Sequence, residues 1–163
     1  RLAYDELLAH QLALTLIRRS QQKAKGRAFT GITGDLRSRL LQNIPFTLTG
    51  AQLRVIAEID EDMISPLAMI RLVQGDVGSG KTMVACAAML NAVECGAQAA
   101  LMAPTEILAR QHAQSLGPLF EKLGLRYIVL TGRDTGKAKE LLIQQIENGA
   151  AQIVIQRFGA RGD

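Results

Sequence analysis

Aromatic residues make up only 4% of the sequence, and tryptophan is absent. A surface that binds single-stranded nucleic acid by stacking bases on aromatic rings needs several such side chains, so this class of site is disfavoured. Apolar residues make up 48% of the 163 positions, which suffices for one hydrophobic core. The sequence therefore predicts one globular domain with an appendage, not a disordered or fibrous chain.

Cysteine and histidine are also scarce, with two of each. Cys86 and Cys95 lie in an apolar stretch without the second ligand pair that a zinc site needs, and we expect free thiols in a reducing compartment. His10 and His112 are far apart and form no metal-binding pattern. The longest apolar run, 83–90, is too short to span a bilayer and no leader opens the chain, so we expect a cytoplasmic protein without a membrane segment.

The charge balance gives little information about partners. The formal net charge is +4, from 19 Lys and Arg against 15 Asp and Glu. An excess of this size favours a polyanionic partner only weakly. Lys137 and Lys139 are predicted to lie on a solvated helix face and not to contact DNA. Sequence motifs, and not the net charge, must therefore identify the class of partner.

Apolar strands alternate with helices over most of the chain. We expect strands at 70–74, 97–102, 127–130 and 151–155, and helices at 50–62, 80–94, 105–123 and 136–148. This alternation predicts an α/β fold in which a parallel β-sheet carries helices on both faces. Ligands of such a sheet bind at the carboxyl ends of its strands.

The first part of the chain is predicted to be an α-helical segment that precedes this sheet. Residues 2–19 place leucines on one helical stripe, and residues 23–34 form a basic loop with three glycines. A short helix is expected at 35–42, ending before Pro45. We therefore divide the chain into a helical connection and linker, 1–44, and an α/β domain, 45–163.

A phosphate-binding loop of the pattern G-x-x-x-x-G-K-T lies at Gly75-Asp76-Val77-Gly78-Ser79-Gly80-Lys81-Thr82. Gly78 and Gly80 allow the backbone N–H groups to turn inward, and the helix that begins there adds the positive end of its dipole. Lys81 is suited to bridging the outer phosphates, and the Thr82 hydroxyl to ligating Mg²⁺. The loop follows an apolar strand and precedes an apolar helix, as its function requires. It predicts a site for Mg-ATP in which all eight residues bind the nucleotide.

Gln52 has two interpretations. With Thr49 it forms a capping box, in which the Gln lies at the third helical position and closes the helix start. The local pattern favours this role. Alternatively, the amide binds the edge of adenine with two hydrogen bonds, as its position upstream of the phosphate loop allows.

Two threonines at strand ends have a similar ambiguity. Thr105, in the segment 102–109, is a good helix cap, and the helix start can also bind a phosphate of nucleic acid. Thr131 with Gly132 follows the next strand and allows the same two roles.

A carboxylate is missing where a P-loop ATPase needs one. Such an enzyme holds Mg²⁺ with an acidic residue at a strand end. The strand 152–155 continues into Gln156-Arg157-Phe158-Gly159, which contains no acidic residue. The acidic cluster at 58–62 belongs to the helix before the phosphate loop. The sequence therefore predicts nucleotide binding more strongly than hydrolysis.

Taken together, these segments resemble the first motor domain of superfamily 2 helicases, and within that group the RecG family of branch-migration helicases. The resemblance spans nearly the whole chain and is sharpest at 71–82 and 102–109. Residues 45–52 are similar to the family's adenine-recognition segment, and residues 1–8 to the helical connection from a DNA-binding wedge domain. The resemblance implies a RecA-like P-loop domain, adenine recognition by Gln52, and contacts of Thr105 and Thr131 with the DNA backbone.

The resemblance also implies an activity: an ATP- and Mg²⁺-dependent translocase, expected to be monomeric, that remodels forks and Holliday junctions of double-stranded DNA. The chain departs from the family at its end. There the family continues into a Gly-Thr-His segment and later into a strand that ends in an Asp-Glu box, whereas 156–159 resembles the residues after that box. We therefore expect a partial domain without the Walker B carboxylates and the second motor domain, which binds nucleotide but hydrolyses it poorly.

Other functions stay open at this point. The motor of a transcription-repair coupling factor has a similar phosphate-loop region, although residues 1–8 and 102–106 favour the RecG family. A non-catalytic nucleotide-binding module would account for the missing carboxylates. A P-loop kinase is disfavoured because the sequence shows neither an acceptor site nor a lid.

Overall fold

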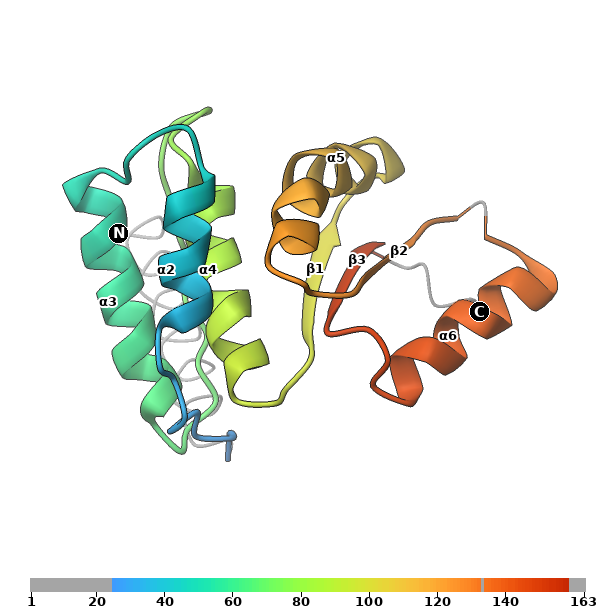
Figure 1. The fold of residues 1–163 in the computed structure, drawn as a ribbon, viewed down its shortest axis with the longest axis horizontal. Helices are drawn as coiled ribbons and strands as arrows, with labels where there is room; N and C mark the ends of the chain where they lie inside the picture. The colour runs from blue at the N-terminus through green and yellow to red at the C-terminus, as the bar shows by residue number, and fades with distance from the viewer. Residues whose placement is uncertain (1–24, 133, 159–163) are drawn as a thin grey trace, which may run out of the picture.

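Three parallel strands form the sheet of the described chain, in the order β1-β3-β2 (Figure 1). The computed structural model describes residues 25–132 and 134–158. The strands are β1 (Ala99–Ala103), β2 (Tyr127–Leu130) and β3 (Ile153–Arg157). Ala99 and Tyr127 both pair with Ile153, so the carboxyl ends of all three strands lie at one edge. The predicted parallel sheet is confirmed, with β3 at its centre.

Two helices cover opposite faces of this sheet. Helix α5 (Glu106–Lys122) connects β1 to β2, and α6 (Gly136–Glu147) returns from β2 to β3. Connections between parallel strands are right-handed, and these two run across the sheet in opposite directions, so the helices lie on opposite faces. The predicted α/β class with helices on both faces is confirmed, and the predicted bounds of these elements differ from the observed ones only at their ends.

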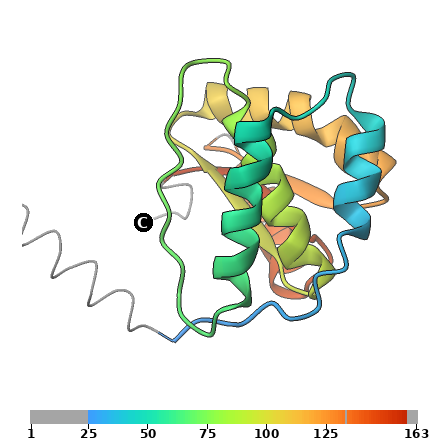
Figure 2. The ribbon, with the colours of Figure 1, turned by 90° about the vertical axis from the view of Figure 1, so that its left-hand side faces the viewer.

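Three further helices lie on the β1 side of the sheet, and α4 is the one next to β1 (Figures 1 and 2). They are α2 (Asp35–Asn43), α3 (Gly50–Ile64) and α4 (Lys81–Glu94), all near the predicted positions. Helix α4 links this layer to the sheet, because its Cys86 and Leu90 are fully buried in the same cluster as Ile153 and Ile155 of β3. The core that positions the phosphate-binding loop is therefore continuous with the core of the sheet.

Polar contacts with α4 and with α3 hold helix α2 against this core. The Glu94 carboxylate of α4 accepts three backbone N–H groups at the start of α2, at 2.6 to 3.0 Å, and so replaces a side-chain cap. Arg37 forms an ion pair with Asp60 of α3 at 2.5 Å, and Asp60 also accepts from the buried Asn91. Leu40 of α2 is 2% exposed within the main cluster. Because α2 shares this core, the domain boundary at residue 44 stays a prediction.

The expected strand at 70–74 does not form, and this prediction is wrong. The segment is extended but has no pairing partner within the described chain (Figure 2). Ile70 and Leu72 consequently expose 73% and 85% of their surface. A strand needs a neighbour for its backbone N–H and C=O groups, and a short apolar run supplies the side chains without supplying that neighbour.

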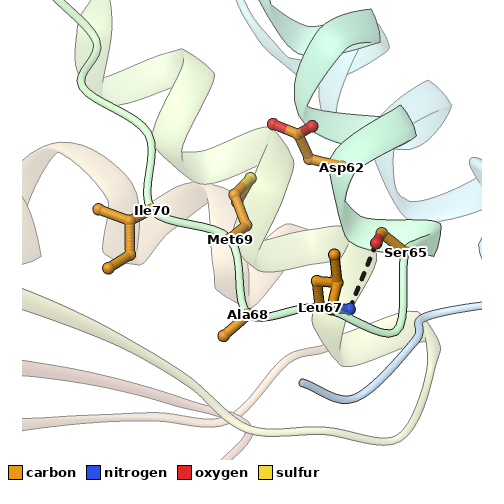
Figure 3. Close-up of a pocket in the computed structure, with 6 residues that line it drawn as sticks. All are labelled: Asp62, Ser65, Leu67, Ala68, Met69 and Ile70. Atoms are coloured by element: carbon orange, nitrogen blue, oxygen red, sulfur yellow. Dashed lines mark hydrogen bonds between the residues drawn. The ribbon is translucent and has the colours of Figure 1, made fainter. Parts of the chain in front are cut away.

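Arg71 holds this segment against α3 instead. Its guanidinium pairs with Glu58 at 2.5 Å and with Asp62 at 2.6 Å, and the Asp62 hydrogen bond is the main cause that raises the pKa of Arg71. The turn before it is closed by a hydrogen bond from Leu67 N to Ser65 Oγ at 3.3 Å. Figure 3 shows this turn, from which the chain continues through Met69 and Ile70. The start of the phosphate-binding loop is therefore fixed by side chains and not by a sheet.

Some predicted elements lie partly or wholly outside the residues that the structure describes. The helix expected at 2–19 lies outside the described ranges. Residues 25–34 form no helix, as predicted, and Lys25 makes an isolated antiparallel bridge to Leu67. Within 25–132 and 134–158, every helix is too short or too polar to cross a bilayer.

Candidate nucleotide-binding site

The phosphate-binding loop is built on two glycines with left-handed backbone. Gly78 has φ of 80° and Gly80, the N-cap of α4, has φ of 77°. Glycine adopts this conformation without the penalty that a side chain imposes. The backbone N–H groups of Gly78, Gly80, Lys81 and Thr82 have no hydrogen-bond partner in the described chain. Together with the positive end of the α4 dipole, these free donors form an anion site.

Lys81 is folded back across this loop. Its Nζ donates to the carbonyl oxygens of Gly75 at 2.8 Å and Asp76 at 2.7 Å, and lies 3.4 Å from Ser79 Oγ. The ammonium group therefore lies within the loop, next to the free N–H donors. A phosphate oxygen is a stronger acceptor for this ammonium than a neutral carbonyl, so a bound phosphate can take over these contacts with little movement of the side chain.

Gln52 uses both of its polar atoms. Its Oε1 accepts from Thr49 N at 2.8 Å, and Thr49 Oγ1 accepts from Gln52 N at 3.2 Å, which confirms the predicted capping box. Its Nε2 also donates to the carbonyl oxygen of Ser79 at 2.9 Å. A Cβ at Gly80 would collide with this Nε2. Gly80 is therefore required by its backbone conformation, and a side chain there would also displace the Gln52 amide.

Gln52 and the loop line one cavity of about 290 Å³. Its walls come from α3, from the segment 73–76, and from Ser79 and Lys81. This volume is at the lower end for a small-molecule site, as expected with the Lys81 side chain folded into it. Two cavities of about 430 and 440 Å³, under α6 and beside β1, are larger, but their walls are mostly apolar and no set of polar groups converges in them. The smaller cavity is therefore the better candidate site.

The structure brings together most of the residues predicted to bind nucleotide. Gln52, Gly75, Asp76, Ser79 and Lys81 line the cavity. The loop tip at 77–78 is exposed to solvent, and Thr82 is half-buried in the first turn of α4. The contact of Gln52 with the loop was missed from the sequence, because it joins residues far apart in the chain and follows from no periodic pattern.

Three carboxylates of α3 near this site are already engaged. Glu58 and Asp62 pair with Arg71, and Asp60 pairs with Arg37. No group of three or more His, Cys, Asp or Glu side chains within the described ranges is arranged to hold a metal ion. Thr82 is thus the protein group that fits Mg²⁺, and further ligands would be oxygens of the nucleotide and water.

The two threonines predicted to contact DNA lie at the carboxyl edge of the sheet. Thr105 is exposed and caps α5, with its Oγ1 accepting from Leu108 N at 3.3 Å. Thr131 is only 5% exposed, because its N–H and Oγ1 both donate to Asp134 Oδ2, at 2.7 and 3.0 Å. Gly132, the next residue, is exposed. The DNA contact of Thr131 stays a prediction, and its hydroxyl is directed inward.

A family model for the DEAD/DEAH box helicase matches residues 49–160. The chain belongs to the DEAD/DEAH box helicase family. The match begins at the cap of α3 and includes the phosphate-binding loop, α4 and all three strands. The Gln52 contact, the loop and the sheet are therefore parts of one family domain.

Known helicases of this family are similar to the chain. The ATP-dependent DNA helicase RecG of Pasteurella multocida (strain Pm70) is 48% identical over 155 residues, which cover 95% of this chain and 22% of that protein. The RecG helicases of Escherichia coli (strain K12) and Bacillus subtilis (strain 168) are 44% and 42% identical over the same length, with 22% and 23% of each covered. These relatives confirm the RecG-type resemblance predicted from the sequence.

A solved structure of RecG bound to a three-way DNA junction has a TM-score of 0.87 and 43% sequence identity to the chain. The matched region includes 98% of this chain and 22% of the chain in that structure. The RecA-like helicase-domain fold is thereby confirmed. The chain spans about a fifth of the length of the relatives it matches.

Proposed function

We propose that the chain is the ATP-binding part of a DNA helicase motor. The observation that carries this proposal is the convergence of Lys81, Gln52 and a set of free backbone N–H groups on one loop within a helicase domain. Residues 75–82 bind the phosphates, as the loop geometry and the helix dipole favour. Lys81 contacts the outer phosphates, and Thr82 supplies one ligand to Mg²⁺. Bound Mg²⁺ would neutralise part of the phosphate charge.

Gln52 can keep its present contacts and still bind adenine. A glutamine amide has two N–H donors and two acceptor lone pairs. One donor is used on Ser79 and one lone pair on the Thr49 N–H. The remaining donor and lone pair match the two groups that adenine presents at one edge. Gln52 therefore links base recognition to the shape of the phosphate-binding loop.

For the whole protein, we propose an activity by analogy with its relatives. The RecG relatives are ATP-dependent DNA helicases, and one was solved on a three-way DNA junction. By analogy we assign ATP-driven remodelling of forks and Holliday junctions to the parent protein, as a helicase and ATP hydrolase with branched double-stranded DNA as its partner. Monomeric state and cytoplasmic location stay predictions.

The chain itself is proposed to bind ATP and to hydrolyse it poorly. Hydrolysis by P-loop enzymes depends on an acidic residue at a strand end. Within the described ranges β3 ends at Arg157 and is followed by Phe158, and Glu58 and Asp62 of α3 pair with Arg71. The same observation supports a second candidate, a non-catalytic nucleotide-binding module.

Calorimetric titration with Mg-ATP and Mg-GTP tests the proposal. Lys81→Ala is expected to lower the affinity for both nucleotides at least tenfold, while the matched control Lys137→Ala on α6 leaves both affinities unchanged. Equal affinities of the wild-type chain for ATP and GTP would contradict adenine recognition. A hydrolysis rate well above background that is lost in Lys81→Ala would contradict the claim of poor hydrolysis and would exclude the non-catalytic module.

A further inference from the structure

We propose that Arg157 is a phosphate-binding residue for DNA at the carboxyl edge of the sheet. This inference rests on the proposed function in a DNA motor and adds a residue to it. The resemblance to helicases implied DNA contacts for Thr105 and Thr131 and gave Arg157 no role. The evidence for Arg157 is therefore its position, its missing partner and its charge.

The position of Arg157 follows from the register of the sheet. Arg157 is the last residue of the central strand β3 and pairs with Ala103 at the end of β1. The next residue, Phe158, donates its N–H to the carbonyl of Ala103 at 2.8 Å. On the other side, the guanidinium lies against Gly132 at the end of β2. Arg157 thus lies between the turn that leads to Thr105 and the turn that contains Gly132.

The orientation of the guanidinium is defined by Gly132. A Cβ built on this glycine would lie 3.8 Å from each of three guanidinium atoms, Cζ, Nε and Nη2. A point at equal distance from these three atoms, and this far from them, is over the flat face of the group. The face of Arg157 therefore packs on the glycine, and its N–H edge is not the part that meets Gly132. An edge of N–H donors is the part of arginine that binds a phosphate with two parallel hydrogen bonds.

Arg157 is also unpaired within the part of the chain that the structure describes. In the described ranges it makes neither an ion pair nor a side-chain hydrogen bond, and its Nε is buried without an acceptor. A buried charged donor without an acceptor is costly, so an incoming oxygen anion would be bound favourably. The carboxylates at this edge are used elsewhere: Asp134 accepts from Thr131, and Glu106 pairs with Arg110 at 3.1 Å. The charge of Arg157 is therefore not neutralised by either of them.

The start of α5 supplies a second set of donors at the same edge. Thr105 caps this helix of 17 residues and accepts from Leu108 N, while the dipole of the helix is positive at this end. The helix start follows β1 directly, one strand away from Arg157. A DNA backbone that crosses the carboxyl ends of β1 and β3 would meet both groups, one as a cation and one as a helix terminus.

Binding of a fluorescein-labelled three-way DNA junction, measured by anisotropy over a series of salt concentrations, tests this proposal. Arg157→Gln is expected to weaken binding by about tenfold at low salt and to reduce the slope of log K against log salt by about 1, because one phosphate contact is lost. Arg157→Lys keeps the charge and should keep the slope, with a smaller loss of affinity. Arg126→Gln is the matched control, since Arg126 is exposed at the opposite edge, before β2.

Each outcome separates the inference from the proposed function. Junction binding by the wild-type chain with equal effects of Arg157→Gln and Arg126→Gln overturns the inference alone. No junction binding by the folded wild-type chain overturns the inference and the DNA part of the proposed function together. Unchanged Mg-ATP affinity and unfolding midpoint in Arg157→Gln establish that its fold is intact. If that variant fails to fold, the affinity of Arg157→Lys at low salt decides: a loss relative to wild type supports the phosphate contact, and an affinity equal to that of wild type overturns it.

Discussion

Replacement of Gln52 by alanine removes two interactions at once. One is the reciprocal half of the capping box, in which Oε1 accepts from Thr49 N, and the other is the Nε2 contact with the Ser79 carbonyl. A helix cap contributes about 1 kcal/mol and an exposed neutral hydrogen bond about as much, so we expect a loss of about 2 kcal/mol in the free energy of unfolding. For a chain of this length that lowers the unfolding midpoint by about 4–8 °C.

The same change is expected to alter phosphate binding, because Gln52 holds the loop as well as the helix start. Calorimetry with inorganic tripolyphosphate isolates this effect, since tripolyphosphate has no base. We predict that Gln52→Ala weakens tripolyphosphate about fivefold, a loss of about 1 kcal/mol, and weakens Mg-ATP further through the lost adenine contact.

Gln52→Glu is the matched control for the two roles. A glutamate keeps an oxygen for the Thr49 N–H, so the capping box and most of the stability should survive. It cannot donate to Ser79 and places a negative charge beside the phosphates, so tripolyphosphate binding should fall more than in Gln52→Ala. Unchanged tripolyphosphate affinity in both variants would refute the reasoning that Gln52 shapes the loop.

Three further changes test the packing of the core and the conformation of the loop. Gly117→Ala should destabilise the fold by about 1–2 kcal/mol in urea unfolding, because a Cβ there would lie 2.9 Å from Tyr127 Cζ, and this overlap outweighs the gain in helix propensity; a stabilised variant would contradict it. Gly80→Ala should weaken tripolyphosphate more than tenfold, since alanine must adopt a φ of 77°, and an unchanged affinity would be the opposite result. Burial raises the pKa of the Cys86 thiol from 9.0 to about 12. The folded state then holds this proton more tightly than the unfolded state, so stability is fully present below pH 9 and is lost as the pH rises toward 12. Cys86→Ala should reduce the fall in urea midpoint between pH 8 and pH 11; an equal fall in both proteins would count against it.

The sequence was sufficient for the elements that depend on local signals. Helices α4, α5 and α6 end before Gly96, Gly124 and Gly149, each with positive φ, and these glycines were visible as helix ends. The capping box at Thr49 and the glycines of the phosphate-binding loop were predictable for the same reason. The loop pattern carries its conformation in its residue types, so the site could be identified before any tertiary contact was known.

Two of the three features that were missed depend on distant residues, and the third depends on a local signal that was not used. Residues 70–74 have the apolar composition of a strand, but a strand exists only beside a partner, and the described chain offers none. The inward position of Thr131 depends on Asp134, whose spacing was a signal that could have been used, since a carboxylate three residues on can accept from the turn. The contact of Gln52 with Ser79 joins two elements, and only the folded chain shows it.

The unfolding midpoint as a function of Mg-ATP concentration tests the central claim most directly, because one experiment reports both folding and binding. A ligand at 100 times its dissociation constant stabilises a fold by about 2.7 kcal/mol, which for a chain of this length raises the midpoint by about 5–10 °C. We predict a rise of this size with the logarithm of Mg-ATP in the wild-type chain and none in Lys81→Ala. A cooperative unfolding transition whose midpoint does not respond to Mg-ATP would contradict the claim that residues 75–82 form a working nucleotide site.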